Sequence, residues 1–352
     1  MPERPVHVYV ANESSDIVTK LVWDGLTLEP LVDVAVGRSP TEIEGPHGLR
    51  IAPTAGMWFV SLAHGTPFGT LWKFDAATNT AQGALQLGMF PASMDVTPNG
   101  QLLLIVNFNL HGDPVPSTVS IVHTPTMAEV ARPFTCVMPH GSRINADGTK
   151  HYSTCMHSQQ LVEIDTRTFQ VTKRFSVAPG HEGALALDDV GAVSGHAAHD
   201  GAPNPTICSP TWAATGRGER SNRFVYVPCN RNGEILEIDV ANDRVTRRFA
   251  TGRAPYNLEV SLDGRLLIAT LKQEQAVAVI DLDEGRELAR IPTTSRLPHG
   301  IALSPDGRVA FVSNEAAAGT RSTVDVIDLQ MLRVVASAEV HEQAGGIDAA
   351  YE

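Results

Sequence analysis

Short apolar runs separated by Asp-Gly and Asn-Gly turns fill the chain from end to end. The segment 297–315 reads LPHGIALSPDGRVAFVSNE, which is a run of strand length, a turn and a second run rich in Val and Phe. Asp-Gly between two such runs is a strong hairpin signal. A third run, VDVIDL at 324–329, follows. No window shows sustained apolar spacing at the helical period. The pattern therefore predicts an all-β chain.

The hairpin at 297–315 belongs to a repeat. Related segments occur at 254–270, 138–155, 90–100 and 45–56. A proline recurs in the copies, and the residue that follows it returns after 43 to 48 residues in all but one case. The exception is a gap of 116 residues, which holds a further copy that begins at 209–213. Each copy predicts four strands. Four strands in about 45 residues are typical of one blade of a β-propeller.

The two ends of the chain predict how the ring closes. Residues 344–351 match a first strand without a second strand after it, and residues 6–12 match a second strand without a first. We expect these ends to pair in one blade, because closure removes the open sheet edges that promote aggregation. The sequence thus predicts a single seven-bladed β-propeller domain over residues 1–352, with an inserted loop at about 181–208.

Two of the strand ends also carry a family resemblance. YVAN at 9–12, FVSN at 311–314 and the Pro-His-Gly lead-ins are similar to the YVTN repeat of seven-bladed propellers of the YncE type. The resemblance covers nearly the whole chain and implies the propeller fold. It leaves the function open, since this superfamily includes binding scaffolds, lactonases, lyases and metal enzymes.

Composition and charge narrow the choice of partners. The chain has 27 Lys and Arg against 39 Asp and Glu, for a net charge of −12, which disfavours nucleic acid and anionic membrane surfaces. No apolar stretch is long enough to cross a membrane and no signal-peptide pattern opens the sequence, so we expect a cytoplasmic protein. Four cysteines are few for a disulfide framework, and in a reducing compartment they are expected to be thiols or metal ligands.

Two positions of each repeat should meet at one mouth of the channel, because the first strand of a blade lines the channel and the second strand ends where the first begins. We call the first the hub position; it follows the lead-in proline in most copies. Its expected occupants are His47, Ala92, His140, Pro210, Tyr256, His299 and Gly345. The second position ends the second strand, with the expected occupants Asn12, Leu62, Asn107, Cys155, Cys229, Thr270 and Asn314.

This mouth collects side chains that bind metals. His157 and His64 lie two residues past Cys155 and Leu62, on the same strand face by the period of two, and Cys208 directly precedes a lead-in. Thiolate and imidazole together suit copper, zinc or iron better than magnesium or calcium. A simpler interpretation is that the His side chains bond backbone carbonyls and the Cys side chains are small buried apolar groups, as we expect for Cys136. The predicted metal ligands are His47, His140, Cys155, His157, Cys208, Cys229 and His299.

The insert 181–208 enters the blade-five lead-in at the same face. It is rich in small residues and carries further polar groups, namely His181, Glu182, His196, His199 and Asp200. A long loop in a compact fold is commonly functional or mobile, so the insert is either a lid with extra ligands or a solvated segment.

Three function hypotheses follow. Motifs for a nucleophile elbow, a P-loop or a zincin are absent from the sequence. The first hypothesis is a metal-dependent oxidoreductase acting on a small molecule, with copper favoured by the mixed ligands and zinc or iron as alternatives. The second is a non-catalytic scaffold that binds a peptide, another protein or a ligand. The third is a metal-independent lactonase or lyase that uses channel His side chains as acid or base.

Overall fold

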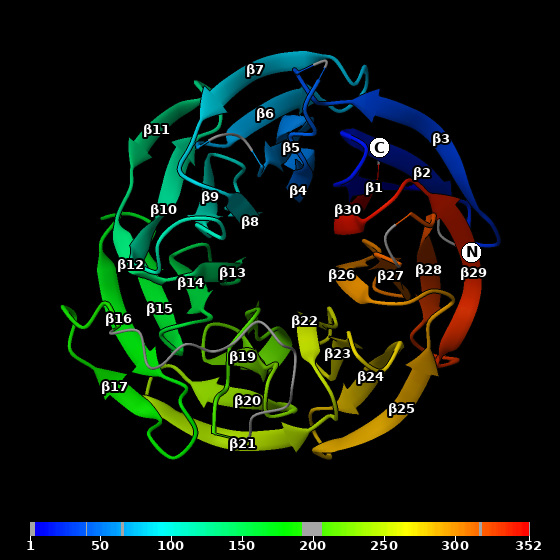
Figure 1. Ribbon diagram of the computed structural model, residues 1–352. Coiled ribbons are helices and arrows are strands. Elements are labelled where there is room, and N and C mark those ends of the chain that lie inside the picture. The colour runs from blue at the N-terminus through cyan, green and yellow to red at the C-terminus, as the bar shows by residue number, and fades with distance from the viewer. Residues whose placement is uncertain (1–3, 40, 65–66, 192–205, 317–318, 352) are drawn as a thin grey trace.

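Seven antiparallel sheets stand around a central channel like the blades of a propeller (Figure 1). The computed structural model describes residues 4–39, 41–64, 67–191, 206–316 and 319–351. Over these residues the only helical elements are two short 3-10 turns, Pro53–Ala55 and Gly218–Arg220. The prediction of a seven-bladed all-β propeller is confirmed.

Each blade runs from an innermost strand at the channel to an outer strand at the rim (Figure 1). The strands of blade 1, from the channel outward, are β30 (Ala344–Tyr351), β1 (Val6–Asn12), β2 (Ile17–Trp23) and β3 (Leu28–Ala35). Those of blade 2 are β4 (Pro46–Ala52), β5 (Met57–Leu62), β6 (Thr70–Asp75) and β7 (Ala81–Gln86). Those of blade 3 are β8 (Pro91–Val96), β9 (Leu102–Asn107) and β10 (Pro116–His123), with both β11 (Ala128–Ala131) and β12 (Phe134–Val137) pairing with β10.

The remaining blades follow the same plan. The strands of blade 4 are β13 (Pro139–Ile144), β14 (Lys150–Cys155), β15 (Gln160–Asp165), β16 (Val171–Ser176) and a fifth, β17 (Gly183–Leu185). Those of blade 5 are β18 (Ala214–Thr215), β19 (Phe224–Cys229), β20 (Glu234–Asp239) and β21 (Arg244–Ala250). Those of blade 6 are β22 (Pro255–Val260), β23 (Leu266–Leu271), β24 (Ala276–Asp281) and β25 (Arg286–Pro292). Those of blade 7 are β26 (Pro298–Leu303), β27 (Val309–Asn314), β28 (Ser322–Asp328) and β29 (Arg333–Val340).

The ends of the chain close the ring as predicted. The innermost strand of blade 1 is β30, which pairs antiparallel with β1 from Val6↔Tyr351 to Asn12↔Ala344. Apolar side chains of blade 7 then pack against blade 1, with Val8, Phe311 and Val326 all fully buried in one cluster. Strand pairing and apolar packing therefore both join the two ends of the sequence.

A repeated hydroxyl contact joins neighbouring innermost strands. Ser313 Oγ accepts the N–H of Gly300 at 2.9 Å and donates to the carbonyl of Gly345 in the next blade at 2.6 Å. Ser61 and Thr270 make the same pair of bonds in blades 2 and 6. These residues occupy the third position of the YVTN-like motif. The hydroxyl at that position therefore links one blade to the next.

The glycine after the hub position lets these strands approach each other. A Cβ on Gly48 would lie 1.9 Å from the carbonyl oxygen of Ala92, and one on Gly346 would lie 2.2 Å from that of His47. Backbone atoms cannot yield as a flexible side chain can, so a larger residue would force the innermost strands apart. At these two positions glycine therefore permits the close approach of neighbouring innermost strands.

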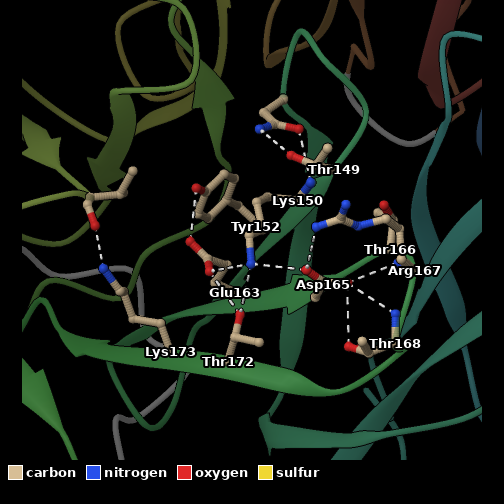
Figure 2. A network of polar contacts seen from close by, with 12 residues as sticks. Thr149, Lys150, Tyr152, Glu163, Asp165, Thr166, Arg167, Thr168, Thr172 and Lys173 are labelled. Carbon is tan, nitrogen blue, oxygen red and sulfur yellow. Dashed lines mark hydrogen bonds and ion pairs between the residues drawn. The ribbon is translucent and has the colours of Figure 1, made fainter.

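A polar network in blade 4 belongs to the scaffold (Figure 2). Tyr152 Oη donates to Glu163 at 2.9 Å, and Lys150 lies 3.3 Å from the same carboxylate. Blade 5 repeats the Tyr–Glu pair with Tyr226 and Glu237 at 3.0 Å, on directly opposed residues of β19 and β20. Burial and the neighbouring carboxylate raise the pKa of both phenols. Recurrence at one register marks these pairs as blade architecture.

Candidate functional site at the histidine mouth

Four aromatic side chains from hub positions gather at one mouth of the channel. The rings of His47 and His299 lie 5.9 Å apart, those of His47 and His140 lie 6.3 Å apart, and Tyr256 lies within 5.6 Å of both His140 and His299. They come from β4, β13, β22 and β26, so blades 2, 4, 6 and 7 contribute one each. We call this group the histidine mouth. It confirms that the hub positions converge.

Hydrogen bonds fix the tautomer of His140. Its Nδ1 lies 2.6 Å from the carbonyl oxygen of Thr211, which can only accept, so Nδ1 carries the proton. The other nitrogen, Nε2, lies 3.1 Å from the hydroxyl of Tyr256 and therefore accepts its proton in the neutral pair. His140 is 2% exposed, so little water competes for these bonds.

A second group of charged side chains surrounds the rings. Glu315 Oε1 lies 3.4 Å from Nε2 of His299 and 2.9 Å from Nζ of Lys272. The Lys272 ammonium in turn lies 4.3 Å from the centre of the Tyr256 ring, within cation–π range. Both Glu315 and Lys272 directly follow the last residue of a second strand. The mouth therefore combines neutral rings with one ion pair.

Burial keeps the imidazoles uncharged. Desolvation lowers the pKa of His140 to about 3, and the charge of His47 adds to the effect. The pKa of His299 falls well below its usual value for the same first reason, with Lys272 next. Desolvation also lowers the pKa of His47, although Glu13 and Glu315 oppose the shift. At neutral pH these three side chains therefore offer lone pairs and N–H donors without charge.

Tyr256 stays protonated for related reasons. Burial raises the pKa of its phenol well above the usual value, and the negative charges of Glu315 and Glu13 raise it further. Its hydroxyl is therefore a hydrogen-bond donor across the physiological range.

The predicted thiolate ligands are wrong, because all four cysteines form disulfides. Cys136 bonds Cys155 and Cys208 bonds Cys229, with no free cysteine among the described residues. The two bridges are equivalent: each ties the segment just before a lead-in to the last residue of that blade's second strand. Cys155 and Cys229 do share one register, as predicted, but the shared feature is a cross-link. Cys136, expected to be a simple buried apolar residue, is half of one.

The other expected ligands do not assemble around one point. Nε2 of His140 and of His299 face Tyr256 and Glu315, and His157 lies half-buried in the turn after β14. Across the described part of the chain, no three His, Cys, Asp or Glu side chains come together as a metal-binding group. The residues His47, His140 and His299 share the mouth, while the full predicted set of seven does not form a ligand sphere.

Two register assignments are wrong by one residue. Pro210 pairs with Cys229 just as Pro139 pairs with Cys155, so Thr211 occupies the hub position of blade 5. In blade 6, Pro255 pairs with Leu271, which places Leu271 at the end of the second strand in place of Thr270. Thr270 instead takes the blade-linking hydroxyl position.

The described parts of the insert lie against blade 4. Gly183–Leu185 forms the fifth strand β17, and Glu182 pairs with Arg248 of blade 5. On either side of residues 192–205, the carbonyl of Asp189 accepts a hydrogen bond from Nε2 of Gln160, the first residue of β15. The N–H of Cys208 donates to Oε1 of Gln159, in the β14–β15 turn. This turn follows the end of β14, so both flanks reach the face of the histidine mouth. His196, His199 and Asp200 lie outside the described residues.

Sequence reasoning missed the charged side chains of the mouth. Glu13, Lys272 and Glu315 each follow the last residue of a second strand, namely Asn12, Leu271 and Asn314. The signal in the sequence is the residue directly after each second strand. His111 lies in the loop after β9 and at no repeated position of the blades, so only the structure shows that it lies beside the histidine mouth.

The opposite mouth of the channel carries a belt of paired charges. Arg50 contacts Asp95 at 2.9 Å and Asp348 at 3.3 Å, and Arg143 pairs with Glu259. These residues line a cavity of about 210 Å³. Two arginines and three carboxylates are thus paired at this end of the channel, at the positions three residues beyond the hub residues.

Comparisons with known proteins agree on the fold alone. No family model matches, and no curated protein matches. A functionally unknown protein from Desulfotomaculum acetoxidans DSM 771 is similar over 98% of this chain and 99% of its own, with a TM-score of 0.70 and 14% identity. A candidate 6-phosphogluconolactonase from Bacteroides fragilis NCTC 9343 is similar over 99% and 98%, with a TM-score of 0.69 and 13% identity. Kuenenia stuttgartiensis hydrazine synthase is similar over 85% and 82%, with a TM-score of 0.62 and 18% identity.

These similarities support the seven-bladed propeller and leave the YncE-type resemblance unconfirmed. In the described residues no helix is long and apolar enough to span a membrane.

Proposed function

We propose that the protein is an enzyme that acts on a small molecule at the histidine mouth, with His140 and Tyr256 transferring or sharing protons. The observation that carries the proposal is the hydrogen bond from Tyr256 Oη to Nε2 of His140, whose other nitrogen is held by Thr211. A buried imidazole with a fixed tautomer, whose remaining lone pair accepts the hydroxyl of a phenol, is an arrangement suited to acid–base chemistry. The reaction class that fits is hydrolysis of a lactone or elimination next to a carbonyl.

In the proposed lactone hydrolysis a substrate carbonyl oxygen first accepts the Tyr256 hydroxyl and releases Nε2 of His140. That nitrogen then takes a proton from water as the water oxygen bonds to the carbonyl carbon, and Tyr256 donates to the oxyanion that forms. When the carbonyl re-forms, the ring C–O bond breaks and His140 returns its proton to the leaving alkoxide oxygen. Because the pKa of His140 is about 3 in the free protein, negative charge that develops beside it has to raise that pKa during the step.

This proposal replaces the copper-dependent oxidoreductase as the leading hypothesis for the mouth. The thiolates that favoured copper are bonded to each other. Zinc and iron lose the same sulfur ligands. The binding scaffold remains the competing hypothesis, and the experiment separates the two.

The test compares the wild-type protein with Tyr256→Phe and His140→Gln, and with Tyr152→Phe as a matched control in the blade 4 Tyr–Glu pair. A panel of lactones and β-substituted carbonyl compounds is assayed after metal removal. We expect kcat of both mouth variants to fall by about 10²- to 10⁴-fold with unchanged melting, while the control keeps its activity. Equal activity in all four proteins would refute the assignment. Binding of a compound that is never turned over would favour the scaffold.

We also propose that the protein works in an oxidising compartment, contrary to the cytoplasmic expectation. Two disulfides at equivalent positions of neighbouring blades support this, because such bonds persist where thiols are not kept reduced.

A further inference from the structure

A pair of histidines outside the hub positions lies beside the histidine mouth. Nδ1 of His64 and Nε2 of His111 are 3.3 Å apart and share a hydrogen bond. On its other side, Nε2 of His64 lies 2.5 Å from Oε1 of Glu13. The ring of Phe90 packs against both imidazoles, with centroid distances of 4.9 and 5.4 Å. The proposed proton chemistry of Tyr256 and His140 uses none of these groups.

The position of His64 is built into the backbone. A Cβ on Gly45, whose φ is +64°, would lie 2.2 Å from Cδ2 of the His64 ring. The backbone N–H groups of Ala63 and His64 bond the carbonyls of Gly45 and Glu44 at 2.8 and 2.9 Å. The imidazole therefore rests against a glycine that holds a left-handed conformation, and any larger residue there would displace it.

Glu13 is held equally firmly. Its Oε2 accepts a hydrogen bond from Nε2 of Gln343 at 3.0 Å, and its backbone N–H bonds the carbonyl of Gln343 at 3.0 Å. Gln343 directly precedes the closing strand β30.

The contact with Glu13 decides which nitrogen of His64 faces His111. Oε1 of Glu13 accepts a hydrogen bond from Nε2 of His64, so Nδ1 is the nitrogen that offers its lone pair on the His111 side. Metal-bound histidines commonly donate their second N–H to a carboxylate in this way. Two zinc–nitrogen bonds of about 2.05 Å at a tetrahedral angle place their nitrogens roughly 3.3 Å apart. The observed separation of the two nitrogens equals that value.

We propose that His64 and His111 bind one divalent transition-metal ion between them, with Glu13 orienting His64. Imidazole ligands suit zinc, copper, nickel or cobalt ions. The two histidines would supply two of the ligands, and water or a substrate atom would take the remaining positions. The site is therefore an open one, next to the mouth but separate from the residues predicted as ligands from the sequence.

The test is titration of protein that has been stripped with a chelator. Zinc is added in a calorimeter, and cobalt is added with its visible absorption as a second readout. The variants are His64→Ala, His111→Ala, Glu13→Gln and Gly45→Ala, with melting curves to show that each is folded. His123→Ala is the matched control, since His123 ends β10 at the opposite face and bonds Thr126. His140→Gln tests whether the ion lies in the histidine mouth instead.

We expect one ion per wild-type chain. His64→Ala and His111→Ala should weaken it at least tenfold, and Glu13→Gln by about 10- to 100-fold, the usual cost of losing an orienting carboxylate. His123→Ala and His140→Gln should bind as the wild type does. Binding that survives in both His64→Ala and His111→Ala, or a wild type that binds neither metal, would overturn the proposal. If only His140→Gln lost metal binding, the ion would instead lie in the histidine mouth, and the proposal would be wrong. None of these outcomes depends on enzymatic turnover.

Discussion

The bridge between Cys208 and Cys229 gives a stability prediction whose size follows from the chain itself. The bridge closes a loop with a sequence separation of 21 residues, and both sulfurs are fully buried. A cross-link stabilises a fold chiefly by restricting the unfolded chain, and a loop of this length contributes about 3 kcal/mol. Replacing both residues by Ala should therefore lower the free energy of unfolding by about 3 kcal/mol.

The expected change in melting temperature is small but measurable. At roughly 2.1 cal/mol/K per residue, a chain of 352 residues unfolds with an entropy of about 0.7 kcal/mol/K. A loss of about 3 kcal/mol then lowers Tm by roughly 4 °C. The bridge between Cys136 and Cys155, with a separation of 19, should contribute about as much.

Calorimetry on Cys208→Ala, Cys229→Ala and the double variant provides the assay. Either single change breaks the bridge, so each single variant should lose nearly as much free energy of unfolding as the double variant. Such strong non-additivity is expected for two groups that share one bond. Thiol titration in denaturant is the control: protein prepared without reductant should show no reactive thiols. The bridge, and the oxidising compartment inferred from it, would be refuted by either of two results. One is that the stability losses of the two single variants add up to that of the double variant, and the other is four reactive thiols in unreduced protein.

Three further predictions concern the ring and its buried histidines. Ser313→Ala leaves the Gly300 N–H and the Gly345 carbonyl without their shared hydroxyl, so unfolding in urea should show a loss of about 1–3 kcal/mol, whereas little loss would mean that water replaces the contact. Deleting residues 344–352 exposes the edge of β1, and light scattering should then detect aggregation or calorimetry a lower Tm; a soluble truncation with unchanged melting would contradict ring closure. Burial lowers the pKa of His151 from 6.5 to about 4, so between these pH values the unfolded chain binds a proton that the folded chain does not. The stability that neutral His151 allows should therefore be complete above pH 6.5 and decrease as the pH drops toward 4. His151→Gln should make the decrease of Tm over this range smaller.

The repeat made the fold predictable from the sequence, including the pairing of β1 with β30. Its register could be read wherever a copy kept both the lead-in and the second strand. Blade 5 gave less information, because β18 has only two residues and shows no strand pattern. In blade 6, Thr270 matched the Thr of the motif while Leu271 stood where Asn is expected. Each error is one residue, the smallest step that moves a side chain to the other face of a strand.

The chemistry of the site was less predictable, because it depends on distances across blades. Cys136 and Cys208 precede their lead-in prolines by three and two residues, so no common register indicated that each has a partner at the end of a second strand. The contact of His64 with His111 joins a strand end of blade 2 to a loop of blade 3. Only folded coordinates relate such positions.

The division of work within the innermost strands supports a chemical role for the hub side chains. Blade-to-blade bonding uses the hydroxyls of Ser61, Thr270 and Ser313 with backbone groups, and in four blades a glycine after the hub position permits close approach of the next strand. Two hub side chains add further links, from Thr211 Oγ1 to the carbonyl of Tyr256 at 2.7 Å and from His140 Nδ1 to the carbonyl of Thr211 at 2.6 Å. Ala92 and Gly345 occupy hub positions of the same ring with no polar side chain at all. Burying imidazole at the other hub positions lowers its pKa and so destabilises the fold in acid. A residue that costs stability where alanine or glycine suffices calls for another explanation, and perturbed titratable groups that meet at a channel mouth are typical of a functional site.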